Sequence, residues 1–115
     1  NLTLVGVFLG VTYAVTGRLA FAIGVHVAWN VALGPLFGLP ISGLSTDAAL
    51  VPVAVDGPAL LTGGDFGPEG GLVMLVALAV AAAGFVWWAR TQHGGVVVDE
   101  RLALPDLWIH ADPDE

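Results

Sequence analysis

The chain has 115 residues, of which 57% are hydrophobic and 11% charged, whereas a soluble domain carries about 25% charged residues. The absence of cysteine excludes disulfide bonds, thiolate metal sites and a cysteine nucleophile. Ten acidic residues against three arginines and no lysine give a net charge of −7. This balance argues against a nucleic-acid partner, because phosphates bind basic side chains, and it is typical of salt-adapted proteins.

Three apolar stretches, residues 2–15, 19–37 and 71–89, predict helices. The second and third are close to the roughly 20 residues that cross a bilayer, whereas the first is shorter and starts at the first residue, as a cut helix would. We therefore expect an all-α membrane protein with about three transmembrane helices of a larger polytopic bundle, of which the chain is a C-terminal piece. Residues 1–90 form the membrane part, and residues 91–115 form an acidic polar tail.

The arginines indicate the orientation of these helices. Arg18 lies between the first and second stretches, Arg90 follows the third, and Arg101 lies in the tail. By the positive-inside rule, the Arg18 turn and the C-terminal tail are cytoplasmic in a multi-pass protein of the cell membrane. The Gly/Pro-rich connection 38–70 then lies outside.

Two polar segments carry secondary expectations. In the connection, residues 48–55 are expected to lie at the interface or to form a strand-like segment, and Pro68 resembles a helix start. Asp65 and Glu69 are four residues apart, but glycines intervene, so we expect solvation or helix capping. In the tail, the clusters 96–98 and 107–109 are expected to pair as short strands or to stay disordered, and His93 and His110 to have no site role.

His26 and Asn30 are the candidate catalytic residues. A helix turns about 100° per residue, so the two side chains share a face one turn apart. Burying an imidazole and a carboxamide in hydrocarbon is costly, so such a pair indicates a functional site, although a lone histidine can also simply bond a neighbouring helix. The pair can stabilise an oxyanion, or His26 can bind a metal with ligands from outside this chain. Trp29 is expected to pack or to face lipid.

The residues around this pair resemble the last motif of the CPBP intramembrane protease family, which includes the CAAX prenyl endopeptidases of type II and the bacteriocin-immunity (Abi) proteins. Residues 16–19 and 22–30 read T-G-R-L and A-I-G-V-H-V-A-W-N, and the family pattern is H-x-x-x-N or H-x-x-x-D on a membrane helix. Residues 34–43 resemble the run that follows this motif in the family, and residues 57–69 resemble the segment that precedes the family's last helix. The resemblance covers about residues 9–90.

This resemblance implies an intramembrane endopeptidase that cleaves a peptide bond near the cytoplasmic membrane face. In the family, a Glu-Glu-x-x-x-Arg motif and an F-x-x-x-H motif on earlier helices activate water, while the residues matching His26 and Asn30 stabilise the oxyanion or help to hold a divalent metal, expected to be zinc. Neither earlier motif is present, so we expect these 115 residues to be inactive alone. The implied partners are the bilayer and a peptide or protein substrate, for which a prenylated C-terminus is one candidate.

Two other functions remain as alternatives. The first is a non-catalytic CPBP-like scaffold or immunity protein, which would lack the earlier motifs. The second is a transporter or channel, which would continue the polar face one or two turns away. The positions that would continue this polar face are apolar, namely Leu19, Ile23 and Leu33. A pore is therefore disfavoured.

Overall fold

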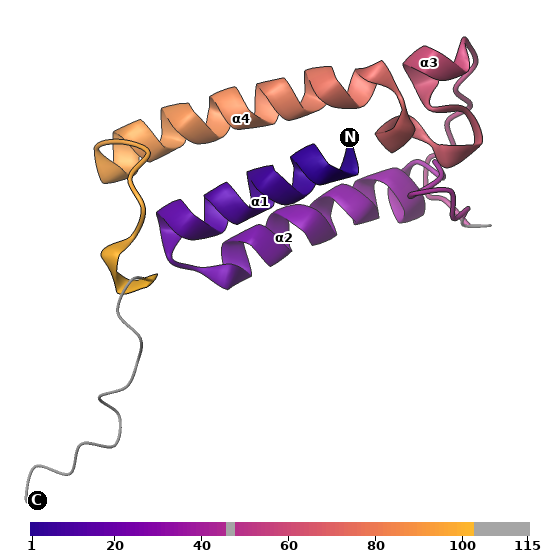
Figure 1. Ribbon diagram of the computed structural model, residues 1–115. Helices are drawn as coiled ribbons and strands as arrows, with labels where there is room; N and C mark the ends of the chain where they lie inside the picture. Colours follow the sequence, from indigo (N-terminus) through magenta and orange to yellow (C-terminus); the bar gives the residue numbers. More distant parts are fainter. Residues whose placement is uncertain (46–47, 103–115) are drawn as a thin grey trace, which may run out of the picture.

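The computed structural model describes residues 1–45 and 48–102, and it is built mainly from three long helices. These are α1 (Leu2–Thr16), α2 (Leu19–Val31) and α4 (Leu72–His93), which lie side by side with alternating direction (Figure 1). Within the described ranges there is no strand, and one isolated bridge joins Ile41 and Leu44. The prediction of a helical chain is therefore confirmed.

Two helices are long and apolar enough to cross a membrane, the 18 residues Leu19–Leu36 and the 22 residues Leu72–His93. Only 17% of each apolar window is buried, whereas the core helix of a soluble protein would be mostly buried. These exposed apolar helices suggest a membrane protein. Helix α1 is also apolar, but its 15 residues fall short of the roughly 20 that cross a bilayer.

The turn between α1 and α2 forms as the sequence predicts. Gly17 ends α1 with φ 62° and ψ 10°, a left-handed conformation that costs glycine little, and its N–H donates to the Tyr13 carbonyl at 2.8 Å. The hydroxyl of Thr16 is buried and donates to the Thr12 carbonyl at 2.7 Å. Two apolar helices are thereby joined by a minimal connection that contains Arg18.

The second apolar stretch is not one regular α-helix over residues 19–37. After Val31 it continues as the π-helical segment η1 (Ala32–Leu36). Pro35 has no N–H and its ring would meet the carbonyl four residues back, so the α-helical pattern cannot continue through it. A wider turn replaces this pattern, in which the Phe37 N–H donates to the Ala32 carbonyl at 3.1 Å.

The connection after η1 folds back on the end of this helix. The N–H groups of Leu50, Val51 and Val53 donate to the carbonyls of Pro35, Leu36 and Phe37 at 2.8–3.0 Å. Carbonyls at a helix end have no partner within the helix, so this segment satisfies them. Residues 48–55 thus form no strand and cap the helix that precedes them.

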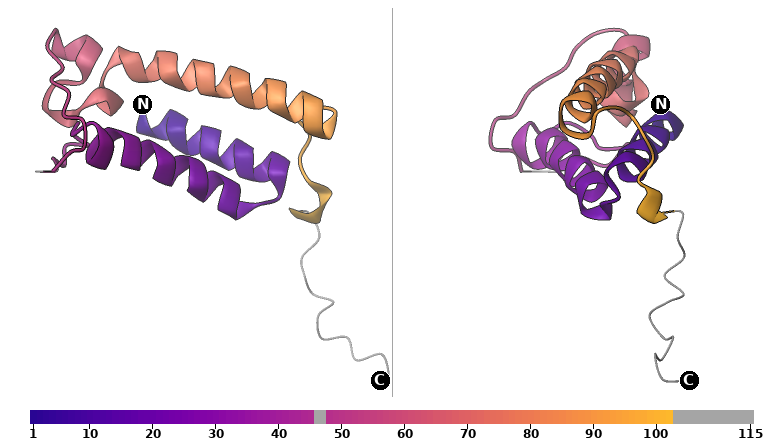
Figure 2. Two further views of the ribbon diagram at one scale, coloured as in Figure 1. Left: turned by 180° about the vertical axis from the view of Figure 1, so that it is seen from behind. Right: turned by 90° about the vertical axis from the view of Figure 1, so that its left-hand side faces the viewer.

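Three short helical turns lead into the last helix. They are α3 (Ala59–Thr62), η2 (Gly64–Phe66) and η3 (Pro68–Gly70). Pro68 is the first residue of η3, and α4 begins at Leu72 after Gly71. Figures 1 and 2 show this connection at the end of the bundle opposite the turn between α1 and α2.

The last helix is longer than the sequence indicates, because it runs past residue 89 to His93 and ends at Gly94 with φ 75°. Residues 91–93 therefore belong to the helix and not to the tail. Residues 96–98 form no strand, and the 3₁₀ turn η4 (Glu100–Leu102) follows. The Asp99 N–H donates to the Ala14 carbonyl at 2.8 Å, which attaches the start of the tail to α1. The expected cluster 107–109 and His110 lie outside the described residues.

An aromatic cluster packs the three helices near the turn between α1 and α2. The Phe21 and Trp88 rings stack at 5.4 Å, and Phe85 lies 5.7–6.2 Å from Trp88, Phe21 and Phe8. His93 lies edge-on to Trp88 at 5.1 Å, which gives it a packing role. This cluster contacts the small buried core of Val15, Phe85 and Ala89.

We predict that Gly67→Ala destabilises the protein while Gly84→Ala does not. Gly67 has φ 86° and ψ −178°, and a Cβ there would collide with the Pro40 carbonyl oxygen, whereas a Cβ at Gly84 meets nothing within 4 Å. The expected loss is about 2 kcal/mol or more for Gly67→Ala. Thermal unfolding in detergent, followed by helical circular dichroism, measures both. Equal midpoints for the two variants would contradict the prediction.

Candidate functional site

Helix α2 carries both candidate residues without interruption, so His26 and Asn30 lie one helical turn apart, as the sequence predicts. The two side chains differ in their surroundings. His26 is exposed, whereas Asn30 is half-buried. The Asn30 Oδ1 atom is buried and accepts no hydrogen bond from any described residue. A buried acceptor without a donor costs about 1–3 kcal/mol, so this oxygen is a notable feature of the site.

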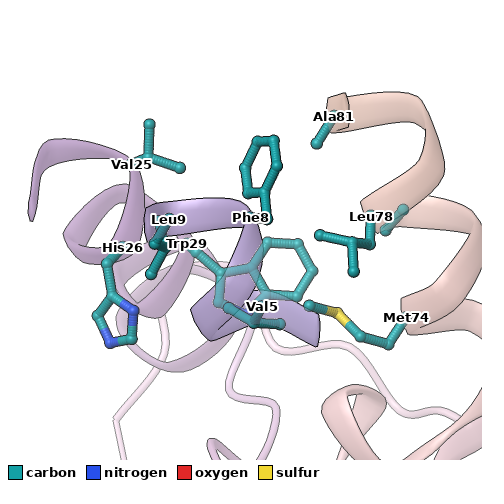
Figure 3. Close-up of a pocket in the computed structure, with 10 residues that line it drawn as sticks. Val5, Phe8, Leu9, Val25, His26, Trp29, Met74, Leu78 and Ala81 are labelled. Carbon is teal, nitrogen blue, oxygen red and sulfur yellow. The ribbon is translucent and has the colours of Figure 1, made fainter. Parts of the chain in front are cut away.

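A cavity of about 70 Å³ lies between α1, α2 and α4, and His26 stands at its edge (Figure 3). Figure 3 shows the imidazole turned away from Met74, Leu78 and Ala81 of α4. Trp29 also lines the cavity, and the other lining side chains are apolar. The imidazole is therefore presented on the outer surface of α2 rather than to the centre of the three helices.

On that outer surface, a groove of about 360 Å³ runs between α1 and α2. Its walls are largely apolar, and His26 and Tyr13 contribute its polar side chains. The imidazole thus borders a hydrophobic groove that is open on one side. Tyr13 was not singled out from the sequence, because its contact with α2 depends on how the two helices pack.

The residues described do not fit a metal ion by themselves. In residues 1–45 and 48–102, no group of three or more His, Cys, Asp and Glu side chains is close enough together to hold one. His26 is a single ligand, and a catalytic zinc site uses about three protein ligands. The metal expected with His26 remains a prediction that depends on ligands from elsewhere.

The C-terminal end of α2, which carries Trp29 and Asn30, is tied to a buried carboxylate. The Glu69 side chain is 6% exposed, and both its oxygens accept hydrogen bonds. Oε1 accepts from the Trp29 Nε1–H at 2.9 Å, and Oε2 accepts from the Ser42 N–H at 2.8 Å and from the Ser42 hydroxyl at 2.6 Å. The three donors are neutral groups, and together they offset the cost of burying the charge.

This arrangement corrects the expectation for Glu69, which is neither solvated nor the cap of α4. Asp65, the other carboxylate of the spaced pair, is exposed as predicted. Trp29 packs in the cavity as expected, but its indole N–H has a definite partner that the sequence did not indicate. These contacts join residues 27 and 40 positions apart, so local spacing could not reveal them.

The backbone around Glu69 is held as well. The Asn1 side-chain amide donates to the Glu69 carbonyl at 2.9 Å and to the Gly71 carbonyl at 2.8 Å. Glu69 thus links four parts of the chain: the beginning of α1, the end of α2, the connection at Ser42 and the beginning of α4. We call Glu69, Trp29, Ser42 and Asn1 the Glu69 cluster.

Three comparisons with known proteins, by family models, by curated sequences and by solved structures, find no match for this chain.

We predict that Ser42→Gly is less damaging than Ser42→Ala. Ser42 has φ 49°, a left-handed conformation that costs a residue with a Cβ about 1 kcal/mol. Both substitutions remove the hydroxyl donor to Glu69, but only glycine also removes this strain. The glycine variant should therefore be more stable by about 1 kcal/mol. Unfolding in mixed micelles at increasing denaturing-detergent fraction compares the two, and an alanine variant as stable as the glycine variant would refute the strain.

Proposed function

We propose that this chain is the C-terminal part of an intramembrane endopeptidase of the CPBP type, which cleaves a peptide bond near the cytoplasmic membrane face. The observation that carries the proposal is the arrangement on α2. An exposed imidazole at His26 lies one turn from Asn30, whose buried oxygen finds no donor among the described residues. The imidazole is thus available to partners beyond this chain, while the carboxamide of Asn30 has its oxygen turned inward.

The surroundings of His26 support a site shared with further helices. Leu19, Ile23, Val27 and Val31 lie on the same side of α2 and are 51–59% exposed. In a bilayer, such an apolar face suits either lipid or protein, but an imidazole facing lipid is costly. Earlier helices that carry the Glu-Glu-x-x-x-Arg and F-x-x-x-H motifs of the family would cover this face and bring polar partners to His26.

The proposed chemistry divides the work between those helices and this chain. The glutamate and histidine of the earlier motifs activate a water molecule, which attacks the peptide carbonyl. The imidazole N–H of His26 and the amide N–H of Asn30 then donate to the oxyanion. Because the Asn30 Oδ1 is buried, the carboxamide would use its N–H groups toward the substrate. Removing one such donor typically lowers kcat by about 10²–10³.

The proposed topology has three crossings, with α1 completed by residues that precede it. The turn with Arg18 and the end of α4 with Arg90 lie at the same end of the bundle (Figure 1), so one cytoplasmic side accommodates both arginines. His26 follows Arg18 by eight residues, which places it roughly 12 Å along the helix from that turn. This depth suits an active site that opens to the cytoplasm.

The proposed substrate is a peptide or protein segment at the membrane, and a prenylated C-terminus is the first to test. A divalent metal, expected to be zinc, belongs to the proposal only with ligands from the earlier helices beside His26. The alternative function is a non-catalytic membrane scaffold or immunity protein of the same fold. That alternative needs no chemistry from His26 or Asn30.

We predict that His26→Ala in the complete protein abolishes cleavage without reducing membrane insertion, because the change replaces a polar group by an apolar one. Asn30→Ala should lower kcat by about 10²–10³ through loss of one donor. A quenched fluorescent peptide with a farnesylated C-terminal CAAX sequence, and the same peptide without the lipid, provide the assay.

His93→Ala is the matched control, because it removes an imidazole that packs on Trp88 away from this site. It should leave the cleavage rate within about twofold. Undiminished cleavage by a purified His26→Ala protein would eliminate the catalytic role of His26, whereas no cleavage by the wild-type protein would favour the scaffold.

We predict that the tail after α4 is cytoplasmic and the connection after η1 is outside. A cysteine at Val97, which is 69% exposed, should resist a membrane-impermeant maleimide on intact cells, while a cysteine at Leu50, which is 82% exposed, should react. Each is introduced without other cysteines, and permeabilised cells should label both. Labelling of Val97 but not Leu50 on intact cells would reverse the topology.

A further inference from the structure

We propose that Glu69 is a positioning residue for the proposed site: through Trp29 it fixes the rotation of α2 and so sets where His26 and Asn30 point. The proposal deepens the proposed function and rests on it for the catalytic effect. The hydrogen-bond network itself is independent of that function. The hydrogen bonds of the Glu69 side chain go to Trp29 and Ser42 and to neither candidate residue, so Trp29 mediates the effect.

Trp29 is well placed to transmit this constraint. It precedes Asn30 directly and follows His26 by three residues, so it lies on the turn of α2 that separates the two candidate residues. Its indole N–H is held by Glu69 Oε1 at 2.9 Å, and its ring lines the cavity against Val5 and Met74 (Figure 3). The apolar contacts fill space without fixing an angle, whereas the hydrogen bond is directional.

The size of the effect follows from helix geometry. Side-chain ends lie roughly 5–6 Å from the axis, so a 20° rotation of α2 moves them by about 2 Å. A displacement of about 1 Å at a reacting group can cost about a hundredfold in rate. A small rotation, with no loss of the fold, would therefore impair the His26–Asn30 pair.

Only a carboxylate suits this position. Its two oxygens face two separate sets of donors, Trp29 on one side and Ser42 on the other. In Glu69→Gln, the single amide oxygen can accept hydrogen bonds from Trp29 or from Ser42, but not from both. The amide N–H groups then face the N–H donor of the other residue, and no hydrogen bond can form between two donors. When Trp29→Phe removes the indole N–H, the glutamine oxygen can bond Ser42 while its N–H groups face the phenyl ring without a competing donor.

A direct chemical role for Glu69 is disfavoured by its surroundings. The side chain is 6% exposed and both oxygens are occupied. It also lies at the end of the bundle opposite the proposed cytoplasmic opening. These features distinguish a residue that positions a helix from one that contacts substrate.

The test uses Glu69→Gln, Trp29→Phe and the double variant in the complete protein, reconstituted in nanodiscs. With the farnesylated CAAX peptide, Glu69→Gln should lower kcat by about ten- to a hundredfold while KM changes little, because orientation and not substrate binding is impaired. Trp29→Phe breaks the same bond and should also lower kcat, and the double variant should have the kcat of Trp29→Phe alone rather than the product of the two losses. Such non-additivity isolates the Trp29–Glu69 pair.

A second readout reports the rotation without using activity. A cysteine at Val27, beside His26 and 52% exposed, carries a trifluoromethyl label for fluorine NMR, and a matched label at Val80 of α4 is the control. Any other cysteine is replaced. Glu69→Gln should shift the Val27 resonance but not the Val80 resonance, and the double variant should return the Val27 signal toward that of Trp29→Phe. Asp65→Asn, which alters an exposed carboxylate of the same connection, should shift neither.

The outcomes separate the two proposals. If the wild-type protein cleaves neither peptide, the protease assignment fails, and the fluorine signals still decide whether Glu69 orients α2. An unshifted Val27 resonance in folded Glu69→Gln, or an unchanged kcat, would overturn the positioning role. Should Glu69→Gln not fold, Trp29→Phe replaces it in the test. This variant should fold, because its phenyl ring keeps most of the packing. It breaks the same hydrogen bond and must therefore shift the Val27 resonance.

Discussion

The arrangement of this chain depends on the need of one buried carboxylate for donors. Glu69 lies inside an otherwise apolar assembly, where an unpaired charge would be very costly. Its oxygens are satisfied by Trp29 of α2 and by Ser42 of the connection, and its carbonyl by Asn1. These hydrogen bonds fix the relative positions of the long helices at one end, although the helices bury little of their own surface. The aromatic cluster around Phe85 packs the helices together at the other end.

Much of the fold could be predicted from the apolar runs, because helices within hydrocarbon must satisfy their own backbone and hydropathy marks them clearly. The starts of α1 and α2, and the turn at Gly17, agree with that prediction. Pro35 interrupts the α-helical pattern because of its covalent geometry, and the chain continues there as a wider π-helical turn. Hydropathy does not distinguish a regular α-helix from a helix that contains such a turn. The extension of α4 to His93 was missed because polarity, which indicates a membrane boundary, does not end a helix.

The candidate site divides in the same way. The spacing of His26 and Asn30 is local, so the sequence alone places them on one face of α2. The role of Glu69 depends on contacts with residues 27 and 40 positions away, which no local pattern specifies. One signal was available: an acid between Pro68 and Gly70, three residues before an apolar helix, is either exposed to solvent or buried with specific hydrogen-bond donors. Without the fold, the first reading is the natural one, because most acids are exposed.

The neutrality of the donors to Glu69 bears on ionic strength. At about 1 M salt, charges in solvent are screened beyond roughly 3 Å, so surface ion pairs lose most of their contribution. Hydrogen bonds from an indole, a hydroxyl and a backbone N–H to a buried oxygen need no counter-charge and lie out of reach of mobile ions. A chain with ten acidic residues and no lysine is thus joined by contacts that concentrated brine does not weaken.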